Sequence, residues 1–569
     1  MSELSQSGSR DLLFRRILMA VISSIIVQCL LMSLIVVLTH LSPTKPLSWP
    51  EEAFSTLISL RTWCYFFVLS TIIILQGVVC SKSYLTAPSL VDTRFASLCS
   101  VFTPHNLTVG GLHLTIGIVL VWLHLSFEDS NYSSLKKNCR TMTGSCITEE
   151  YVFLVTSGLF TAVHHFLKNN FLTRRYLQFP IIPQSKFSQV RRETSKLISI
   201  AMTSAVWPTT YFLVFYYTFG GYIRRLIASI MFLNVEEPLD KISRLFDTNL
   251  VFHVWLYSGL FSLTMDSMHL LFQVHLTEWM EFEIGQSVYS DNRGSMSLPE
   301  ALGMDEVPII QHLGYLDLMT LSQKQRSRRG IVFSLSQPGG HPYNWNCIVE
   351  KCLGMIKGYS KKVEEVCAVR QEITAPLSAP ASLDRPYSFH MRNLARVESL
   401  EKTPGTAIKP VPSTGEFLVE FFRSRRQRIV DYVMSKPLVL YFFGVRSDSR
   451  IQHLLVTGQP VVWAVDAISS LAVISLKEDP YGIVQKDLPG MIEELLGLKL
   501  ALDKLHKMIL LSRKSQQDDK NIRHLLGALR SAGKRSIYRI FVAFNEYFED
   551  LALEQNVKDQ LQGFFSFRE

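Results

Sequence analysis

The stretch that decides the fold is "ILMAVISSIIVQCLLMSLIVVLTHL", residues Ile17–Leu41, which contains no Lys, Arg, Asp or Glu. A membrane-spanning helix needs about 20 mostly apolar residues, because its backbone must satisfy its own hydrogen bonds across a hydrocarbon core of roughly 30 Å. Arg10, Arg15 and Arg16 precede the stretch, and no small-residue cleavage site comes before "THLSPTKP". It is therefore predicted to be a permanent anchor rather than a cleaved signal peptide.

Five further apolar stretches extend this prediction to a six-helix transmembrane domain over residues 1–272. The fifth stretch is interrupted by Pro208, which lipid-embedded helices tolerate when neighbours satisfy the freed carbonyl, and the sixth contains Asp266. The predicted fold class is a membrane α-helical protein whose spans precede an all-α domain. Counted with the first stretch, the predicted spans are residues 17–41, 63–80, 107–127, 151–167, 197–217 and 250–271.

The distribution of charge separates the two halves of the chain. Residues 1–272 hold 21 Lys and Arg and 15 Asp and Glu, whereas residues 273–569 hold 37 and 34. The second half has the charge density of a water-facing domain, but its small net charge forms no strong phosphate-binding face, so direct binding of nucleic acid is not expected. Within it, residues 273–373 and 416–569 are predicted as helical blocks, and the Pro/Ser-rich residues 374–415 as a disordered linker.

The membrane topology follows from basic residues in the short connections. With the N-terminus inside, the inner connections hold twelve Lys and Arg and the outer connections hold nine. This bias predicts that six spans return the C-terminus to the same cytosol-like side as the N-terminus. Cys139 and Cys146 then share an outer loop, where an oxidising lumen permits a disulfide, and Asn131 in the same loop begins a glycosylation sequon.

Two patterns suggest a membrane enzyme or a transporter as the alternative function. His124 precedes Asp129 with the H-x4-D spacing of glycerolipid acyltransferases, in which the Asp orients a His general base. The second signature of those enzymes, a Phe-Pro-Glu-Gly-Thr-type stretch, is absent. Asp266 is the only acidic residue inside a predicted span, a place that often marks an ion path. No internal repeat accompanies it, and a helix–helix contact near Ser262 or Ser267 is the favoured explanation.

Metal and cofactor sites are not predicted. His164 and His165 lack further ligands at a fitting spacing. Cys347, Cys352 and Cys367 with His341 permit a zinc site by spacing alone, but a helix is expected there and the cysteines suit small buried positions.

The stretch "FSLSQPGGHPYNW", Phe333–Trp345, is predicted to be a rigid elbow rather than a phosphate-binding loop. Its two prolines lack N–H donors, and no lysine adjoins it, whereas the two glycines favour a turn. Asn344 is expected to cap the following helix, and Trp345 to anchor its end. The residues assigned to the elbow are Pro338, Gly339, Gly340, His341, Pro342 and Trp345.

A basic amphipathic stretch lies near the C-terminus. Its apolar residues recur at helical spacing, and basic residues decorate the same region. The stretch either docks a partner or an anionic membrane, or packs as a core helix with a solvated basic face, and the second interpretation is favoured. The residues assigned to the partner or membrane face are Lys534, Arg535, Ile537, Arg539, Phe541 and Phe544.

These features together resemble the Ndc-type transmembrane nucleoporins, the multi-spanning pore-membrane proteins of the nuclear pore complex. The resemblance covers essentially the whole chain in order. It is closest in "VFSLSQPGGHPYNW" at residues 332–345 and extends to "FPIIPQSKF" (Phe179–Phe187), "VFHVWL" (Val251–Leu256), "LDLMTLSQ" (Leu316–Gln323) and "SIYRI" (Ser536–Ile540).

The resemblance implies a non-enzymatic role: anchoring the pore scaffold in the nuclear envelope, aiding pore assembly and recruiting soluble nucleoporins. The implied partners are nuclear membrane lipid, scaffold and inner-ring nucleoporins, and the WD-repeat nucleoporin ALADIN through the C-terminal half. Both termini are then expected on the cytosol and pore side. Residues 374–415 form a shorter linker than the family pattern, which leaves linker-borne contacts without support.

Overall fold

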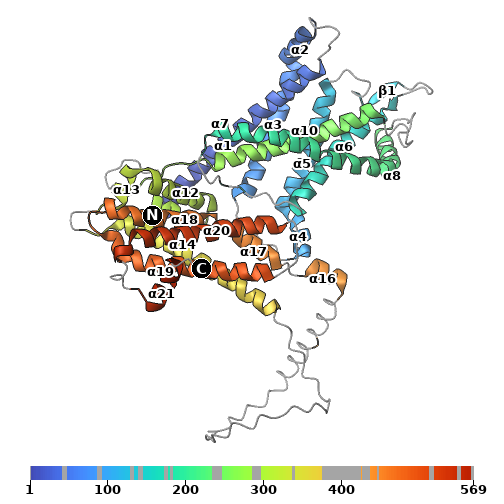
Figure 1. Ribbon diagram of the computed structural model, residues 1–569. Coiled ribbons are helices and arrows are strands. Elements are labelled where there is room, and N and C mark those ends of the chain that lie inside the picture. Colours follow the sequence, from blue (N-terminus) through green and yellow to red (C-terminus); the bar gives the residue numbers. More distant parts are fainter. Residues whose placement is uncertain are drawn as a thin grey trace, which may run out of the picture.

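The structure is a computed structural model and is mostly helical (Figure 1). It describes residues 2–40, 48–85, 93–127, 134–138, 145–171, 177, 179, 184–232, 247–284, 296–335, 340–374, 425, 436–444, 447–511, 518–547 and 553–565.

Long helices build the N-terminal half. Helix α10 lies at its centre and packs against α1, α6, α7 and α8. The pairs α5–α6 and α3–α5 complete the bundle, and α2 and α4 are short connecting helices. The bounds are α1 Ser2–Thr39, α2 Trp49–Ile58, α3 Leu60–Leu85, α4 Arg94–Val101, α5 Pro104–Phe127, α6 Glu149–Phe171, α7 Lys186–Ser204, α8 Val206–Met231 and α10 Thr248–Leu276.

Five helical stretches of the described chain are long and apolar enough to cross a membrane: Gly8–Thr39, Leu60–Leu85, Pro104–Phe127, Lys186–Met231 and Gln459–Glu478. The first four are only 22–39% buried inside the protein, so they turn apolar side chains such as Leu30, Phe67 and Leu226 outward. The fifth is 72% buried. Apolar surface exposed on this scale needs lipid around it, whereas the fifth stretch is already covered by protein.

Each predicted span falls on a helix, but the fifth is wrong in its continuity. Residues 197–217 straddle the end of α7 at Ser204 and the start of α8 at Val206. Pro208 cannot donate a hydrogen bond to the carbonyl four residues earlier, which explains a break at this place. Helices α6 and α10 match the fourth and sixth predicted spans, although their polar residues keep them outside the set of most apolar helices.

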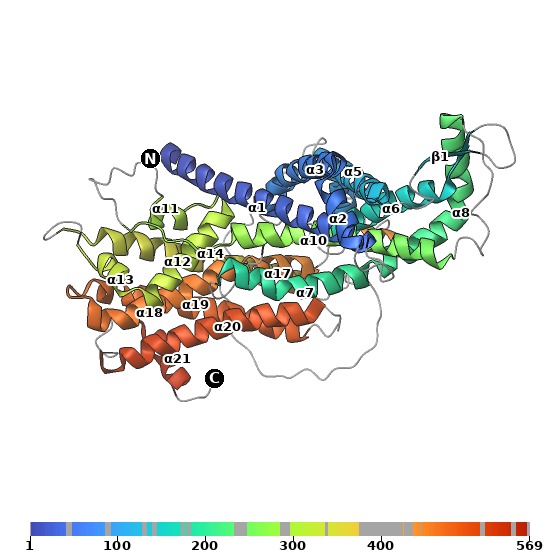
Figure 2. The ribbon, with the colours of Figure 1, turned by 90° about the horizontal axis from the view of Figure 1, so that it is seen from above.

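Helices α1 and α10 continue beyond the membrane half. At 1.5 Å per residue, the 38 residues of α1 extend about 57 Å, well over the thickness of a bilayer core. Leu13, Ala20 and Val21 of α1 and Phe272 and Leu276 of α10 belong to the same hydrophobic core as the C-terminal helices. The two halves of the protein therefore share one core. Figure 2 shows α1 running from the membrane half to the side of α11 and α12.

The C-terminal half is one helical domain although its helices come from two blocks of sequence. Helix α12 packs on α18, and α14 packs on α19 and α18, so the blocks 273–373 and 416–569 share a core. The bounds are α11 Leu298–Leu302, α12 Pro308–Lys324, α13 Arg326–Val332, α14 Tyr343–Thr374, α16 Pro437–Phe443, α17 Ser447–Val456, α18 Gln459–Glu478, α19 Ile483–Leu511, α20 Asp518–Ala543, the 3₁₀ turn η1 Asn545–Tyr547 and α21 Gln555–Phe565.

The structure contains a short β-hairpin that the sequence did not predict, and it does not describe most of the predicted linker. Strands β1 (Lys136–Asn138) and β2 (Ser145–Ile147) form an antiparallel hairpin, in which Lys137 pairs with Cys146. Three-residue strands carry too little alternation for a sequence pattern to reveal. Residues 375–424, which contain nearly all of the predicted linker, lie outside the described residues, so its predicted disorder stays a prediction.

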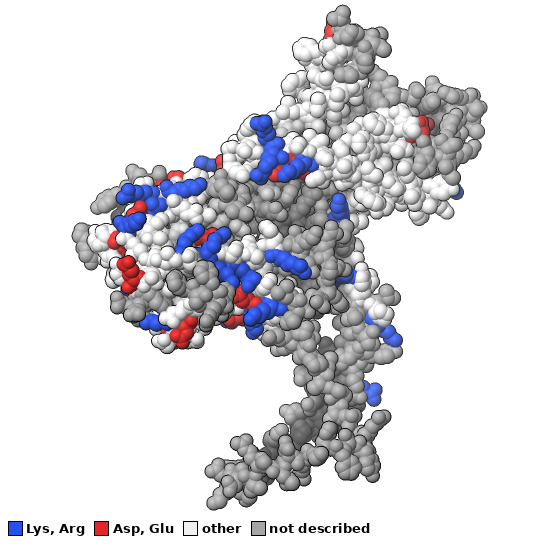
Figure 3. Space-filling model, viewed as in Figure 1, with Lys and Arg blue, Asp and Glu red and all other residues white. Residues whose placement is uncertain are grey.

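Charge on the molecular surface follows this division. On the face drawn in Figure 3, Lys, Arg, Asp and Glu side chains gather over the C-terminal helical domain. On the described surface of the N-terminal bundle they are sparse on this face, apart from a group at α7.

Candidate functional site

The joint between the membrane half and the helical domain is held by polar contacts on α1 and α10. The Nη1 atom of Arg16 donates to the carbonyl of Leu276, the last residue of α10, at 3.0 Å. A cation at this position also interacts favourably with the helix C-terminus. One residue before the end of α10, Nε2 of His275 lies 2.9 Å from Ser23 Oγ of α1. These bonds fix α1 against α10 where both helices enter the domain.

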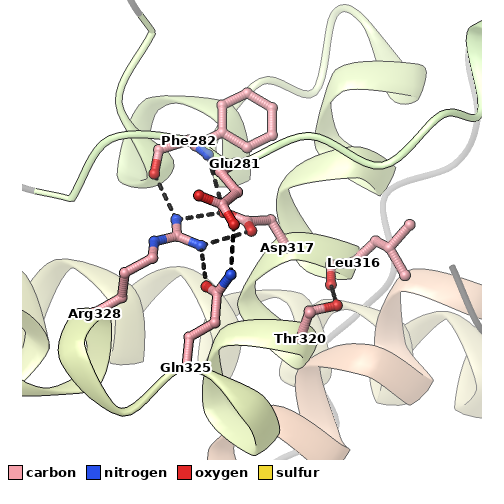
Figure 4. Close-up of polar contacts among 7 residues, drawn as sticks. All are labelled: Glu281, Phe282, Leu316, Asp317, Thr320, Gln325 and Arg328. Atoms are coloured by element: carbon pink, nitrogen blue, oxygen red, sulfur yellow. Dashed lines mark hydrogen bonds and ion pairs between the residues drawn. The ribbon is translucent and has the colours of Figure 1, made fainter.

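A buried ion pair holds the chain where it leaves α10 (Figure 4). Asp317 of α12 has no exposed surface, and Arg328 of α13 binds it with Nη1 and Nη2 at 2.8 and 2.7 Å. The backbone N–H of Phe282 donates to the same carboxylate at 3.0 Å, and the Phe282 carbonyl accepts from Arg328 Nη2 at 2.6 Å. Asp317 and Arg328 therefore attach the segment after α10 to two helices of the domain.

Farther into the membrane half, α1 and α10 are joined by a second polar group. Gln28 Nε2 donates to Ser267 Oγ at 2.9 Å, and Thr264 Oγ1 donates to Gln28 Oε1 at 3.0 Å. All three side chains are buried. Ser267, the sequence neighbour of the partly exposed Asp266, thus takes part in a helix–helix contact, as the favoured structural explanation for polar residues in that span expects.

The structure does not support the alternative catalytic group. His124 is buried in the last turn of α5, and its ring stacks on Tyr257 of α10 with centroids 5.7 Å apart. Its Nδ1 has no hydrogen-bond partner, and Asp129 lies outside the described residues. A histidine packed between two helices in this way is a structural contact, and no described residue hydrogen-bonds its Nδ1 to orient it as a base.

Of the predicted elbow, Gly340, His341, Pro342 and Trp345 are described, while Pro338 and Gly339 lie outside the described residues. Trp345 is fully buried, and its Nε1 donates to Oδ2 of Asp487 at 2.8 Å.

The prediction for Asn344 is wrong. Helix α14 already begins at Tyr343, and Asn344 Nδ2 donates to the carbonyl of Ile331 at 3.2 Å, so it caps the end of α13 instead.

No group of three or more His, Cys, Asp and Glu suited to a metal ion occurs among the described residues. Cys352 and Cys367 are buried on α14, and Cys347 is partly buried. Burial raises the pKa of the Cys352 thiol, which disfavours the thiolate that zinc would need. His164 lies beside Tyr211, with ring centroids 5.9 Å apart.

The basic stretch near the C-terminus lies in α20. Its apolar residues pack against the core, whereas its basic residues lie at the edge of the packed face. Ile537 and Phe544 are buried in the core, so their assignment to a partner-binding face is wrong. Phe541 is partly buried and packs against the same core. The helix needs these residues to cover α18 and α19.

The basic residues of α20 lie along its packing boundary. Arg530 Nε donates to Asp503 at 2.7 Å, Arg539 Nη1 donates to Ser470 Oγ at 3.2 Å, and Arg535 lies 3.7 Å from Asp466. Burial raises the pKa of the Asp466 carboxyl, and the nearby guanidinium groups oppose that shift. Arg535, Tyr538, Arg539 and Val542 remain exposed and form one stripe of the helix; Lys534 is half-buried beside it.

In the loop predicted to face outward, Cys146 is disulfide-bonded, whereas Cys139 and Asn131 lie outside the described residues. The adjoining helix end is pinned by Glu149, a buried residue whose Oε1 accepts from Arg224 Nη1 at 3.1 Å and from the hydroxyl of Tyr216 at 3.2 Å.

The sequence is similar to known proteins over its whole length. It matches the family described as "Nucleoporin protein Ndc1-Nup" over residues 11–562. The chain belongs to this nucleoporin family.

Its similarity to "Nucleoporin NDC1" of Homo sapiens is 27% identity, covering 99% of this chain and 98% of that protein. "Nucleoporin NDC1" of Xenopus laevis is 24% identical with full coverage of both, and "Nucleoporin Ndc1" of Drosophila melanogaster is 25% identical with 98% of each covered. The human alignment runs over 666 positions against 569 residues here, so that relative carries insertions. The family name supports a structural role, and neither a membrane enzyme nor a transporter is supported.

In this Ndc1-Nup nucleoporin, the ion pair that attaches the segment after α10 to the helical domain was not predicted from the sequence. Asp317 lies within the motif "LDLMTLSQ" that carries the family resemblance, but its partner Arg328 follows eleven residues later in a basic run with ordinary surface composition. A lone Asp on an otherwise apolar helix face is the one signal that points to a buried partner.

His312 of this nucleoporin should make its stability depend on pH. The ring stacks on Phe179 with centroids 4.7 Å apart, its Nδ1 donates to the Pro308 carbonyl at 2.6 Å, and burial lowers its pKa to about 4. Because the unfolded pKa is about 6.5, this contribution is complete above pH ~6.5 and is lost as the pH falls towards 4. At pH 5 the loss is about 2 kcal/mol.

Thermal unfolding of the detergent-solubilised protein at pH 7.5 and pH 5 measures this effect. His312→Asn should reduce the loss of stability between these two pH values. An unchanged pH dependence in His312→Asn would assign the loss to other groups.

Proposed function

We propose that this nucleoporin, a structural membrane component of the nuclear pore complex, anchors the pore scaffold in the nuclear envelope, supports pore assembly and recruits soluble nucleoporins. The observation that carries the proposal is the shared core of the two halves, reached by Leu13 of α1 and Phe272 of α10. Lipid-exposed helices that continue into a charged helical domain transmit force without a flexible joint. A scaffold anchor requires this mechanical property.

We further propose that six spans place both termini on the cytosol and pore side. The start of α1 and the end of α10 both reach the core of the C-terminal domain, which supports a common side for them. The excess of basic residues in the inner connections supports assigning that side to the cytosol. On the opposite, lumenal side we propose the Cys139–Cys146 disulfide and Asn131 as a glycan acceptor; the disulfide-bonded state of Cys146 supports the first.

The exposed stripe of α20 is proposed as a face for scaffold and inner-ring nucleoporins and for an ALADIN-type WD-repeat nucleoporin. It consists of Arg535, Tyr538, Arg539 and Val542. Tyr and Arg are enriched among the residues that dominate protein–protein binding energy. Lys534 lies beside the stripe. No direct contact with nucleic acid is proposed, and the membrane contact is assigned to the lipid-exposed helices.

A structural role predicts that the polar residues of the alternative function are dispensable for localisation. A variant combining His124→Gln, Asp129→Asn and Asp266→Asn keeps side-chain volume nearly constant and removes the imidazole base, the carboxylate that would orient it and the intramembrane carboxylate. Fluorescently tagged variant protein should give the nuclear-rim signal of the wild type, because anchoring depends on packing rather than on these groups.

The melting temperature of the purified variant serves as the control for folding. A variant that folds normally and leaves the rim would contradict the proposed role and favour an enzyme or transporter.

A further inference from the structure

A cavity of about 500 Å³ lies where the two halves of the protein meet, in the region of α4, α5 and α17 in Figure 1. Its walls come from the C-terminal parts of α3 and α6, the N-terminal part of α5, the middle of α10, the start of α12 and the end of α17. The volume falls within the roughly 300–1,000 Å³ of small-molecule sites. Because these helix ends lie beside the helical domain, the cavity is at the level of the cytosol-facing lipid headgroups.

The charge of the cavity wall favours a phosphate. Among the described residues that line it, Lys82 is the one formally charged residue, and none is Asp or Glu. Several hydrogen-bonding imidazoles accompany the lysine; His113 and His165, for example, lie with ring centroids 5.9 Å apart. The histidines of the wall are His105, His113, His165, His269 and His312.

Two amide side chains in the wall each have one polar atom without a hydrogen-bond partner. Gln76 is 2% exposed, and its Oε1 has no partner, while its Nε2 lies 3.0 Å from the weakly accepting Sγ of Cys80. If the amide is turned over, Nε2 becomes the unpartnered atom, so one polar atom is unsatisfied either way. The Oδ1 atom of Asn169 is likewise buried and without a partner. An unsatisfied buried polar atom costs about 1–3 kcal/mol, which a ligand with hydrogen-bonding groups would recover.

The remaining wall is apolar. Phe166, Met265, Met268 and Ile309 line the same cavity. Water alone could hydrogen-bond to the two amides, but it makes no favourable contact with these apolar side chains. The combination of apolar walls, basic groups and unsatisfied amides matches a ligand that is amphipathic.

We propose that this cavity binds one phospholipid of the cytosol-facing leaflet, a lipid whose headgroup carries hydrogen-bond donors beside its phosphate. Lys82 and His105 lie on the wall to receive the phosphate, and Gln76 and Asn169 receive the donors. Phosphatidylethanolamine and phosphatidylinositol have this chemistry; phosphatidylcholine has the phosphate without the donors. The proposal rests on the membrane placement proposed above and is independent of the role at the pore.

Native mass spectrometry of the full-length chain, released from detergent micelles with each of the three lipids added, tests this site. We expect one retained phosphatidylethanolamine or phosphatidylinositol per chain, and at least tenfold less phosphatidylcholine. The double variant Gln76→Leu/Asn169→Leu should lose this preference at least tenfold. Val109→Trp, which fills the cavity, should lose the lipid itself. Thr71→Leu, on the exposed side of α3, is the matched control and should retain it.

Equal retention of phosphatidylcholine by the wild type would overturn the proposal, as would full retention of the preferred lipid by both cavity variants. Free phosphoethanolamine and inositol phosphate test a soluble source of the same headgroup chemistry. We expect neither to displace the lipid, because neither contacts the apolar wall; displacement by either would reassign the cavity to a soluble ligand. The melting temperature of lipid-free Gln76→Leu/Asn169→Leu should equal or exceed that of the wild type, which shows that a loss of lipid is not a loss of folding.

Discussion

Asp317→Ala is expected to destabilise the protein by about 3–5 kcal/mol, because it leaves Arg328 buried without its counter-charge. The Asp317 carboxylate is fully buried and accepts two hydrogen bonds from Arg328 and one from the backbone of Phe282. All three interactions are lost together. The melting temperature of the full-length protein in detergent should fall clearly, and limited proteolysis should cut the segment after α10 first.

The matched control is another ion pair of the same domain. Arg326 lies 3.5 Å from Glu478 but is 85% exposed, and an exposed pair of this kind contributes about 0–1 kcal/mol. Arg326→Ala should therefore melt nearly as the wild type does. Equal melting temperatures for Asp317→Ala and Arg326→Ala would show that the pair does not hold the joint.

Trp345→Ala should cost about 3–5 kcal/mol, the range measured for removing a large buried aromatic side chain. The side chain is fully buried, packs near Phe333 with ring centroids 5.9 Å apart, and donates to Asp487 at the start of α19. Its removal leaves a cavity and an unpaired Asp487. Thermal unfolding of the full-length chain measures the loss.

Two further variants separate the causes. Trp345→Phe keeps most of the volume but loses the N–H donor, so it should destabilise less than Trp345→Ala. Trp207→Ala removes an exposed tryptophan from α8 and should have little effect on melting. A Trp345→Ala protein as stable as Trp207→Ala would refute the anchoring role of Trp345.

The membrane half was predictable because long apolar runs have few alternative structures. The apolar run that begins at Ile17 lies on α1 up to the end of that helix at Thr39, and each later apolar run falls on helices. The break at Ala205 was not predicted, because a proline within an apolar run can either kink a helix or be absorbed by its neighbours. Helix α18 shows the reverse case: Gln459–Glu478 is apolar enough to span, yet it is covered by α12, α14 and α20. Composition does not distinguish lipid from protein as the surrounding apolar medium.

The sequence predicted a residue of the candidate site only where the type of that single residue was sufficient evidence for its role. Trp345, a large aromatic residue after a turn, was expected to anchor a helix, and it is buried. By contrast, the Asp317–Arg328 pair and the cavity beside Gln76 arise from residues brought together by tertiary packing. In α20, Ile522, Leu526 and Leu529 recur at the helical period and lie in the core. The same period makes Ile537 and Phe544 core residues, which leaves the basic and tyrosine side chains to face outward.

The most direct test of the central claim is quantitative affinity purification of the tagged full-length chain from detergent-solubilised nuclear envelopes. Wild-type protein should recover scaffold and inner-ring nucleoporins, and Tyr538→Ala/Val542→Ser should recover at least tenfold less while melting normally, because both side chains are exposed on α20. Leu500→Ala, an exposed apolar residue on α19, is the control and should recover the wild-type amount. Recovery of no nucleoporins by the folded wild-type chain would contradict the account.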